Sequence, residues 1–112
     1  MVMIAGPYRS HASSEAEIAA NLRTLNEAAL AVYERGHLPV IGVNLALPII
    51  EVAGVESYDR IMLPLSLALA DRCDAILRVG GRSEGADEEV ARIERRGGRV
   101  FASVGDIPAQ EG

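Results

Sequence analysis

Aromatic side chains and cysteine are scarce in this chain. Tryptophan is absent and aromatic residues make up only 4% of the 112 residues, so the core must be built from aliphatic side chains. The single cysteine, Cys73, has no partner for an internal disulfide, and metal sites normally need clusters of ligands. We therefore expect Cys73 to be a buried, reduced thiol, and we expect neither a metal ion nor another cofactor.

Excess positive charge and long apolar runs are also missing. The net charge of −5 argues against a nucleic-acid-binding surface and against a polybasic membrane anchor. No run approaches the roughly 18 apolar residues that span a bilayer, and the first apolar run is too short for a signal peptide. We expect a cytoplasmic protein whose partners include neither nucleic acid nor membrane. A few local arginines would still suffice to bind a small phosphorylated ligand.

Hydrophobic residues make up 49% of the chain, enough to form the core of one domain spanning residues 1–112. Apolar runs predict four buried strands, at 2–5, 38–41, 74–79 and 99–102. Helical spacing predicts three helices, at 14–35, 59–70 and 86–96, whereas 42–54 is expected to be a loop with a short helix. Such alternation is typical of a parallel sheet covered on both faces. The expected fold class is α/β, a three-layer α/β/α sandwich with a doubly wound parallel sheet of four to five strands.

Local signals bound several of these helices. Ser14 and Glu17 form a capping-box pattern, in which Ser14 caps the first helix and Glu17 reaches back to it. Gly36 fits the position just after the end of that helix. Pro64 lies inside the pattern at 59–70, so that helix either bends at Pro64 or begins there. We expect the tail at 110–112 to be frayed.

The position of a ligand site follows from the topology. Open parallel sheets bind ligands beyond the carboxyl ends of their strands, near the point where the strand order reverses. Three segments leave those ends here, at 6–11, 42–44 and 80–89. Polar residues and glycines are concentrated in the first and third of these segments. We therefore expect the site to lie between them.

The segment 80–89 is the most informative. Gly85 and the glycines before it let the backbone approach a ligand, and a helix is expected to begin at about Ala86. The acids at 87–89 would stabilise the first turn of that helix in any case. Helical phase separates them, because Glu88 shares a stripe with the arginines that follow, which is typical of a solvated, salt-bridged face. Glu89 borders the buried face, so we single it out as the key carboxylate.

The other two segments supply candidates for substrate contacts. After the turn at Gly6, the ring of Tyr8 would pack against a sugar or a base, and Arg9 and Ser10 would contact phosphate. The alternative is that Tyr8 and Arg9 are ordinary surface residues. Asn44 either bonds a sugar hydroxyl or caps a helix, and the sequence leaves both possibilities open.

Several motifs together resemble the nucleoside 2-deoxyribosyltransferase superfamily, most closely its short branch of unassigned function. They are Ala5-Gly6-Pro7-Tyr8, Asp74-Ala75, Ser83-x-Gly85-x-x-x-Glu89 and Gly97-Gly98. The likeness covers residues 2–104, and the Ser-x-Gly-x-x-x-Glu loop is moderately specific in this context. It implies a flavodoxin-like sheet and a homodimer or homotetramer with sites near subunit contacts. It also implies chemistry at the anomeric carbon of a nucleoside or nucleotide.

The resemblance assigns roles to individual residues. In the family the glutamate of this loop is the nucleophile, a role that falls on Glu89. Phosphate-binding members use the first loop and the serine of the glutamate loop, which implies Arg9 and Ser83. A retaining mechanism also needs a second acid that protonates the leaving base. The family's aspartate would fall at Leu65-Ser66, and Asp59 is the nearest aspartate upstream in that segment, so Asp59 is the candidate second acid.

Taken together, the sequence predicts an N-glycosidase or deoxyribosyltransferase that acts on nucleosides or their monophosphates. The alternative is a nucleotide-binding or regulatory module without turnover, which the missing aspartate favours. A looser likeness to phosphoribohydrolases lacks the proline and threonine of their glutamate loop. One segment is apolar nearly all round, which independently predicts a homo-oligomer, and it contains Ile61, Met62, Leu63, Leu65, Leu67 and Leu69.

Overall fold

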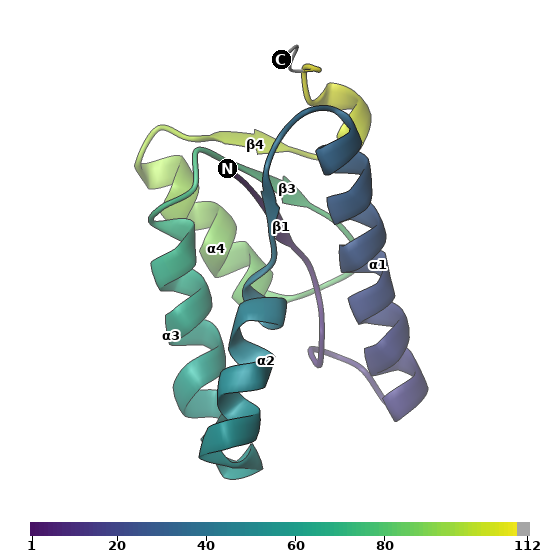
Figure 1. Ribbon diagram of the computed structural model, residues 1–112, viewed down its shortest axis with the longest axis vertical. Coiled ribbons are helices and arrows are strands. Elements are labelled where there is room, and N and C mark those ends of the chain that lie inside the picture. Colours follow the sequence, from purple (N-terminus) through teal and green to yellow (C-terminus); the bar gives the residue numbers. More distant parts are fainter. Residues whose placement is uncertain (110–112) are drawn as a thin grey trace.

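The structure, a computed structural model, describes residues 1–109, so the expected fraying of 110–112 lies outside it. Within this part of the chain there are four strands and four α-helices (Figure 1). The strands are β1 (Val2–Ala5), β2 (Pro39–Val40), β3 (Ala75–Arg78) and β4 (Arg99–Phe101). The helices are α1 (Glu15–Glu34), α2 (Gly42–Ala53), α3 (Tyr58–Ala70) and α4 (Glu84–Arg95), with short 3-10 turns at Val55–Ser57 and Val104–Asp106.

The sheet is parallel throughout, with the strand order β2-β1-β3-β4. The chain passes from β1 to β2 in one direction and from β3 to β4 in the other, so the order reverses between β1 and β3. α1 covers one face of the sheet, and α4 with the end of α3 covers the other (Figure 1). The predicted class, a three-layer α/β/α sandwich with a flavodoxin-like doubly wound parallel sheet, is confirmed with four strands.

Alternation along β1 divides the core into two parts. Val2 and Ile4 face α1 and pack with its buried leucine and valine. Met3 and Ala5 face the opposite side and pack with residues of α3 and α4. Cys73 belongs to this second part and is a buried free thiol, as predicted. Because both faces of β1 are buried, its sequence is a continuous apolar run.

The start of α1 follows the predicted cap with one difference. Ser14 caps the helix, and its hydroxyl accepts a hydrogen bond from the Glu17 backbone N–H at 3.1 Å. The Glu17 carboxylate reaches back to Ser13, accepting from its backbone N–H at 2.7 Å and from its hydroxyl at 2.9 Å. At the other end, Gly36 has φ of 91°, a conformation that favours glycine after a helix.

The prediction of a loop with a short helix at 42–54 was wrong, because α2 is a continuous helix of 12 residues. Pro48 favoured the loop, since an interior proline removes a hydrogen bond and costs a helix about 3 kcal/mol. In the structure Pro48 is exposed, whereas Ala46 and Ile50 on another side of α2 are buried. Packing of α2 against α3 offsets the local cost, and local propensity contains no information about such packing.

The remaining elements differ from prediction mainly at their ends. α3 begins at Tyr58 with Pro64 in its interior, so it does not begin at the proline. α4 begins at Glu84, two residues before the expected Ala86, because Ser83 is its cap. Strands β2, β3 and β4 are each shorter than the apolar runs that predicted them. Among residues 1–109, no helix combines the length and apolar character needed to cross a bilayer.

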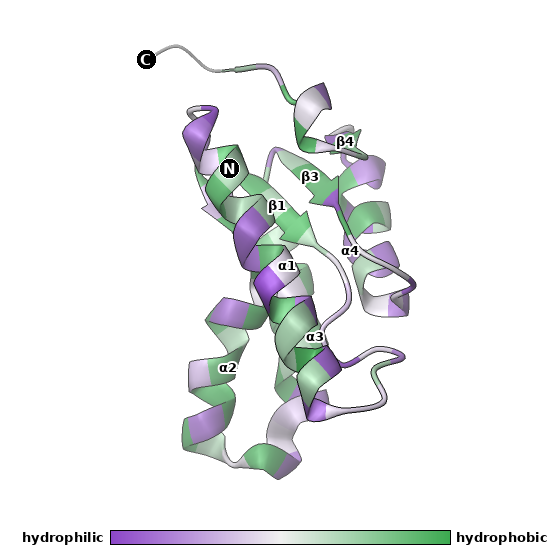
Figure 2. Ribbon diagram, turned by 90° about the vertical axis from the view of Figure 1, so that its right-hand side faces the viewer, coloured by the Kyte–Doolittle hydropathy of each residue, from purple (hydrophilic) through white to green (hydrophobic). Residues whose placement is uncertain are grey.

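The molecule is elongated, with extents of 42 × 28 × 24 Å. α2 and the first turns of α3 extend beyond the sheet and pack against each other (Figures 1 and 2). One side of this extension is apolar and exposed, and it comprises Leu45, Ile49, Val52 and Val55. We call these four residues the α2 apolar row.

Candidate functional site

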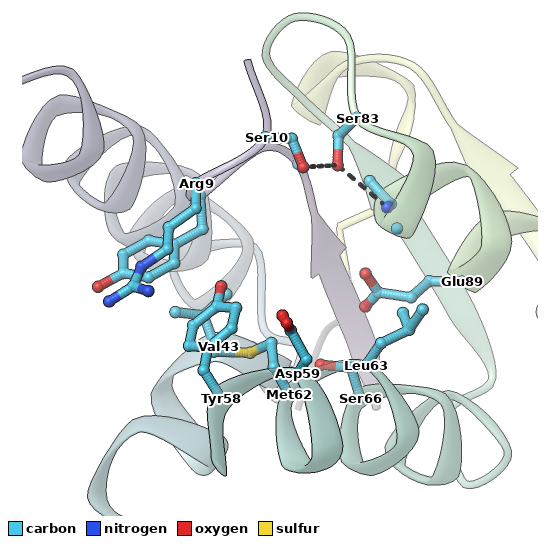
Figure 3. Close-up of a pocket in the computed structure, with 14 residues that line it drawn as sticks. Arg9, Ser10, Val43, Tyr58, Asp59, Met62, Leu63, Ser66, Ser83 and Glu89 are labelled. Carbon is cyan, nitrogen blue, oxygen red and sulfur yellow. Dashed lines mark hydrogen bonds between the residues drawn. The ribbon is translucent and has the colours of Figure 1, made fainter. Parts of the chain in front are cut away.

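A cavity of about 300 Å³ lies at the point where the strand order reverses (Figure 3). Its walls come from the loop after β1, the loop after β3, the start of α4, and one side of α3. The structure brings all the predicted site residues except Asn44 to this cavity, namely Gly6, Tyr8, Arg9, Ser10, Asp59, Ser83, Gly85 and Glu89. Sequence reasoning missed the roles of the other lining residues, which are Val43, Tyr58, Met62, Leu63, Ser66 and Ala86.

Glu89 is a buried carboxylate at this cavity. It lies in the second turn of α4 and is only 8% exposed, and its carboxylate points into the cavity (Figure 3). No hydrogen-bonding group among residues 1–109 contacts this carboxylate within hydrogen-bonding distance. Burial raises the pKa of Glu89 from 4.5 to about 7, and the Arg78 guanidinium only partly opposes this shift. The side chain is thus poised to gain or lose a proton near neutral pH.

The loops that follow β1 and β3 are joined by two side-chain contacts. The Ser10 and Ser83 hydroxyl oxygens lie 3.3 Å apart, and His11 Nε2 lies 3.0 Å from a carboxylate oxygen of Glu84. The backbones also pack tightly, because a Cβ on Gly6 would lie 2.6 Å from the Val79 carbonyl oxygen. Only glycine fits at that position, so the first loop is held against the edge of the sheet beside the cavity.

Ser83 has a structural task as well as a place at the cavity. Its hydroxyl accepts a hydrogen bond from the Ala86 N–H at 3.2 Å, which caps α4. A hydroxyl that accepts this bond still has one hydrogen to donate. That hydrogen is available to the neighbouring Ser10 or to a ligand oxygen. The predicted ligand contact by Ser83 is therefore compatible with its role as the cap.

Arg9 and two tyrosines form the rim of the cavity. The Arg9 guanidinium lies 4.2 Å from the centroid of the Tyr58 ring, a cation–π contact between the first loop and α3. Burial raises the pKa of the Tyr58 phenol. The Tyr8 carbonyl oxygen accepts a hydrogen bond from the Asn21 side chain at 2.9 Å, which anchors the loop on α1. These planar groups offer a surface on which an aromatic ligand can stack.

One stripe of α3 lines the cavity from the rim to its inner end. Asp59 is exposed in the first turn, Met62 and Leu63 follow one turn later, and Ser66 is buried a turn beyond them. Figure 3 shows the Asp59 carboxylate and the Ser66 hydroxyl reaching the cavity from this helix. The spacing is helical, so placing Asp59 at the site was already a signal for its neighbours at i+3, i+4 and i+7.

The structure places Asn44 elsewhere, and this corrects its assignment as a substrate-binding residue. Asn44 is exposed on α2, and its side chain donates a hydrogen bond to Asn26 Oδ1 of α1 at 2.7 Å. It does not line the cavity. The reason is that 42–53 is helical, so the chain turns away from the strand end immediately after Gly42.

The expected pairing of Glu88 with the arginines of α4 is also absent from the described residues. Arg92 instead makes two hydrogen bonds to Asp71, at 2.8 and 3.0 Å, and these lower the pKa of that carboxyl. Asp87 lies 3.2 Å from the Nε of Arg78. Glu88 is exposed. Of the three adjacent acids, only Glu89 is buried.

No cluster of three or more histidine, cysteine, aspartate or glutamate side chains within residues 1–109 is arranged to hold a metal ion. Comparison of the chain with protein-family models and with curated proteins gave no match. The likeness to nucleoside 2-deoxyribosyltransferases therefore depends on the motifs of the sequence alone. What this cavity offers chemically is a buried carboxylate, neighbouring hydroxyls and an aromatic rim.

Proposed function

We propose that the protein is an enzyme that cleaves or transfers the N-glycosidic bond of (deoxy)nucleosides or nucleoside monophosphates. The observation that carries the proposal is the unpartnered, buried carboxylate of Glu89 at the cavity. A carboxylate that no protein group hydrogen-bonds is available as a nucleophile once it is ionised. The ordinary glycosidase pair of carboxyl groups has its candidate second member in Asp59, which lines the same cavity.

The chemistry would take two steps. The Glu89 carboxylate attacks C1′, and the bond from C1′ to the base nitrogen breaks with its electron pair on the base. The base takes a proton from the acid form of Asp59, and a glycosyl ester remains on Glu89. Water then attacks C1′ and gives its proton to Asp59, which releases Glu89 and the free sugar. With a second base as acceptor, the same ester gives a transferred sugar.

The rim of the cavity suits the two ends of such a substrate. The rings of Tyr8 and Tyr58 are aromatic surfaces for a base, and Arg9 adds a cation beside them. Ser10 and Ser83, with the first amides of α4, could bind a phosphate. No metal or other cofactor is required by this scheme.

The decisive experiment measures base release from a panel of nucleosides and nucleoside monophosphates by chromatography. We expect release by the wild-type protein and none above background by Glu89→Gln, which keeps the shape of the side chain and removes its charge. Glu88→Gln is the matched control, because Glu88 is the exposed neighbour on the same turn. Absence of base release from every wild-type reaction would refute the proposal.

A nucleotide-binding module without turnover is the second candidate. It is favoured by the inner end of the cavity, where α3 presents the neutral Ser66, while Asp59 is exposed at the rim. Calorimetry that detects nucleotide binding, together with no base release, would support this candidate. Loss of both binding and turnover would remove it.

We also propose that the protein is a homodimer or homotetramer. The α2 apolar row supports this, because it exposes four branched aliphatic side chains on the part of the molecule that extends beyond the sheet. The residues of the apolar segment at 61–69 are largely half-buried on the neighbouring α3, so the row is adjacent to further apolar surface. A second copy of the chain would cover it.

A further inference from the structure

Two buried polar side chains lack hydrogen-bond partners. The buried polar or charged residues within 1–109 are Ser57, Ser66, Ser83 and Glu89. The Ser57 hydroxyl bonds to Arg60 and to a backbone carbonyl oxygen, and the Ser83 hydroxyl caps α4. Neither Ser66 nor Glu89 has a partner among the described residues, and both line the same cavity. Buried polar groups are normally hydrogen-bonded, so this pair calls for a ligand that bonds to them.

The position of Ser66 is set by its neighbours. Ser66 is 4% exposed, yet its hydroxyl reaches the cavity. On its other side the backbone of Gly42 is so close that a Cβ added there would lie 2.0 Å from Ser66 Oγ. Serines in helices often bond back to the carbonyl four residues earlier, as Thr24 does to Ala20 in α1, but Ser66 makes no such bond. Its donor and its acceptor are therefore both free toward the cavity.

The chemistry around Ser66 selects the kind of group it would bind. The ionised carboxylate of Glu89 lines the same cavity and would repel a second anion, which disfavours phosphate at this end. The side chains of Met62 and Leu63 beside it are apolar. A neutral group that both donates and accepts matches a serine hydroxyl, and a sugar hydroxyl is such a group.

We infer that Ser66 is a specificity-determining residue, whose hydroxyl binds one hydroxyl of the substrate's furanose and holds the sugar against Glu89. This inference rests on the proposed function, since attack at C1′ requires the sugar, rather than the base, to lie beside Glu89. Ser66 does not act on the bond itself. It selects sugars that carry the matching hydroxyl and excludes those that lack it.

The test uses binding, so that it does not depend on turnover. Calorimetry compares the full-length Glu89→Gln protein with its Ser66→Ala derivative, using four forms of one nucleoside: the riboside, 2′-deoxyriboside, 2′,3′-dideoxyriboside and 5′-deoxyriboside. Ser66→Ala should weaken binding about 5- to 10-fold for forms that carry the recognised hydroxyl, as expected for one lost hydrogen bond. Forms that lack this hydroxyl should bind equally to both proteins. The matched control is Ser57→Ala, which removes a buried hydroxyl outside the cavity and should affect no form selectively.

A merely structural role for Ser66 would weaken binding of all four forms by the same factor, and that outcome overturns the inference. Failure of any form to bind overturns it as well. If hydroxyl-dependent binding is seen but the wild-type protein releases no base, the inference stands and the proposed chemistry fails. If base is released but Ser66→Ala has no selective effect, the chemistry stands and the inference fails.

Discussion

At the scale of single residues, the raised pKa of Glu89 makes a prediction about stability. Its folded-state pKa is about 7 and its ordinary value is 4.5, so between these values the folded protein holds a proton that the unfolded chain has lost. Stability is therefore fully present below about pH 4.5 and falls as pH rises to about 7. Glu89→Gln removes this loss, and at pH 8 it should unfold with a free energy about 3 kcal/mol above that of the wild type.

Denaturant unfolding of both proteins at several values between pH 4.5 and 8 measures this difference directly. Other ionisable groups contribute equally to both proteins, so they cancel in the comparison. Glu88→Gln, on the exposed side of the same turn, should track the wild type at every pH. A difference between Glu89→Gln and the wild type that does not grow with pH would contradict the burial of an ionisable carboxylate at this position.

The same group predicts a pH profile for the proposed reaction. A nucleophilic carboxylate works only when ionised, so kcat/KM should rise with pH until Glu89 has lost its proton at about pH 7. Below that value kcat/KM should fall about tenfold for each pH unit, and above it a plateau is expected. Initial rates at low substrate concentration between pH 5 and 8.5 give the profile. A plateau that already begins near pH 5 would show that the essential group is not Glu89.

At the scale of elements, patterns of local sequence predicted what local forces decide. The continuous apolar run at β1 and the cap at Ser14 were predicted correctly, because each depends on adjacent residues alone. α2 was missed because the penalty at Pro48 is visible in the sequence, whereas the compensating contact with α3 is formed by residues far along the chain. The misplacement of Asn44 followed directly from that error, since a loop would have left it at the strand end.

The contact of α2 with α3 can be tested at Gly42. Alanine usually favours a helix over glycine by about 1 kcal/mol, but here its Cβ would lie 2.0 Å from Ser66 Oγ and 2.8 Å from Ser66 Cβ. Overpacking of this kind costs about 1–3 kcal/mol, so Gly42→Ala should lower the free energy of unfolding. Gly85→Ala is the matched control in the first turn of α4, where the nearest atom would be Leu63 Cδ1 at 3.6 Å. Equal effects of the two substitutions in chemical denaturation would argue against the tight approach at Gly42.

At the scale of the whole molecule, the doubly wound topology made the site predictable. The reversal of strand order between β1 and β3 brings together loops that are separated by more than 70 residues, as the Ser10–Ser83 contact shows. That rule found the two loops and Glu89 without any contact being known. It gave no means of finding Tyr58 or Ser66, because they depend on how α3 packs across the sheet edge. A topological rule locates strand ends, whereas the wall opposite them is set by tertiary packing.

The last prediction concerns assembly, which is a property of the molecule's surface. Val52 is 90% exposed at the centre of the α2 apolar row, and branched aliphatic side chains in such a row are costly to leave in water. We expect sedimentation velocity to show a dimer or tetramer for the wild type and a monomer for Val52→Glu combined with Ile49→Glu. Leu30→Glu is the matched control, because Leu30 is an equally apolar exposed residue on α1 and should leave the assembly intact. Dissociation by Leu30→Glu alone would move the interface to α1, and a monomeric wild type at micromolar concentration would exclude a stable homo-oligomer.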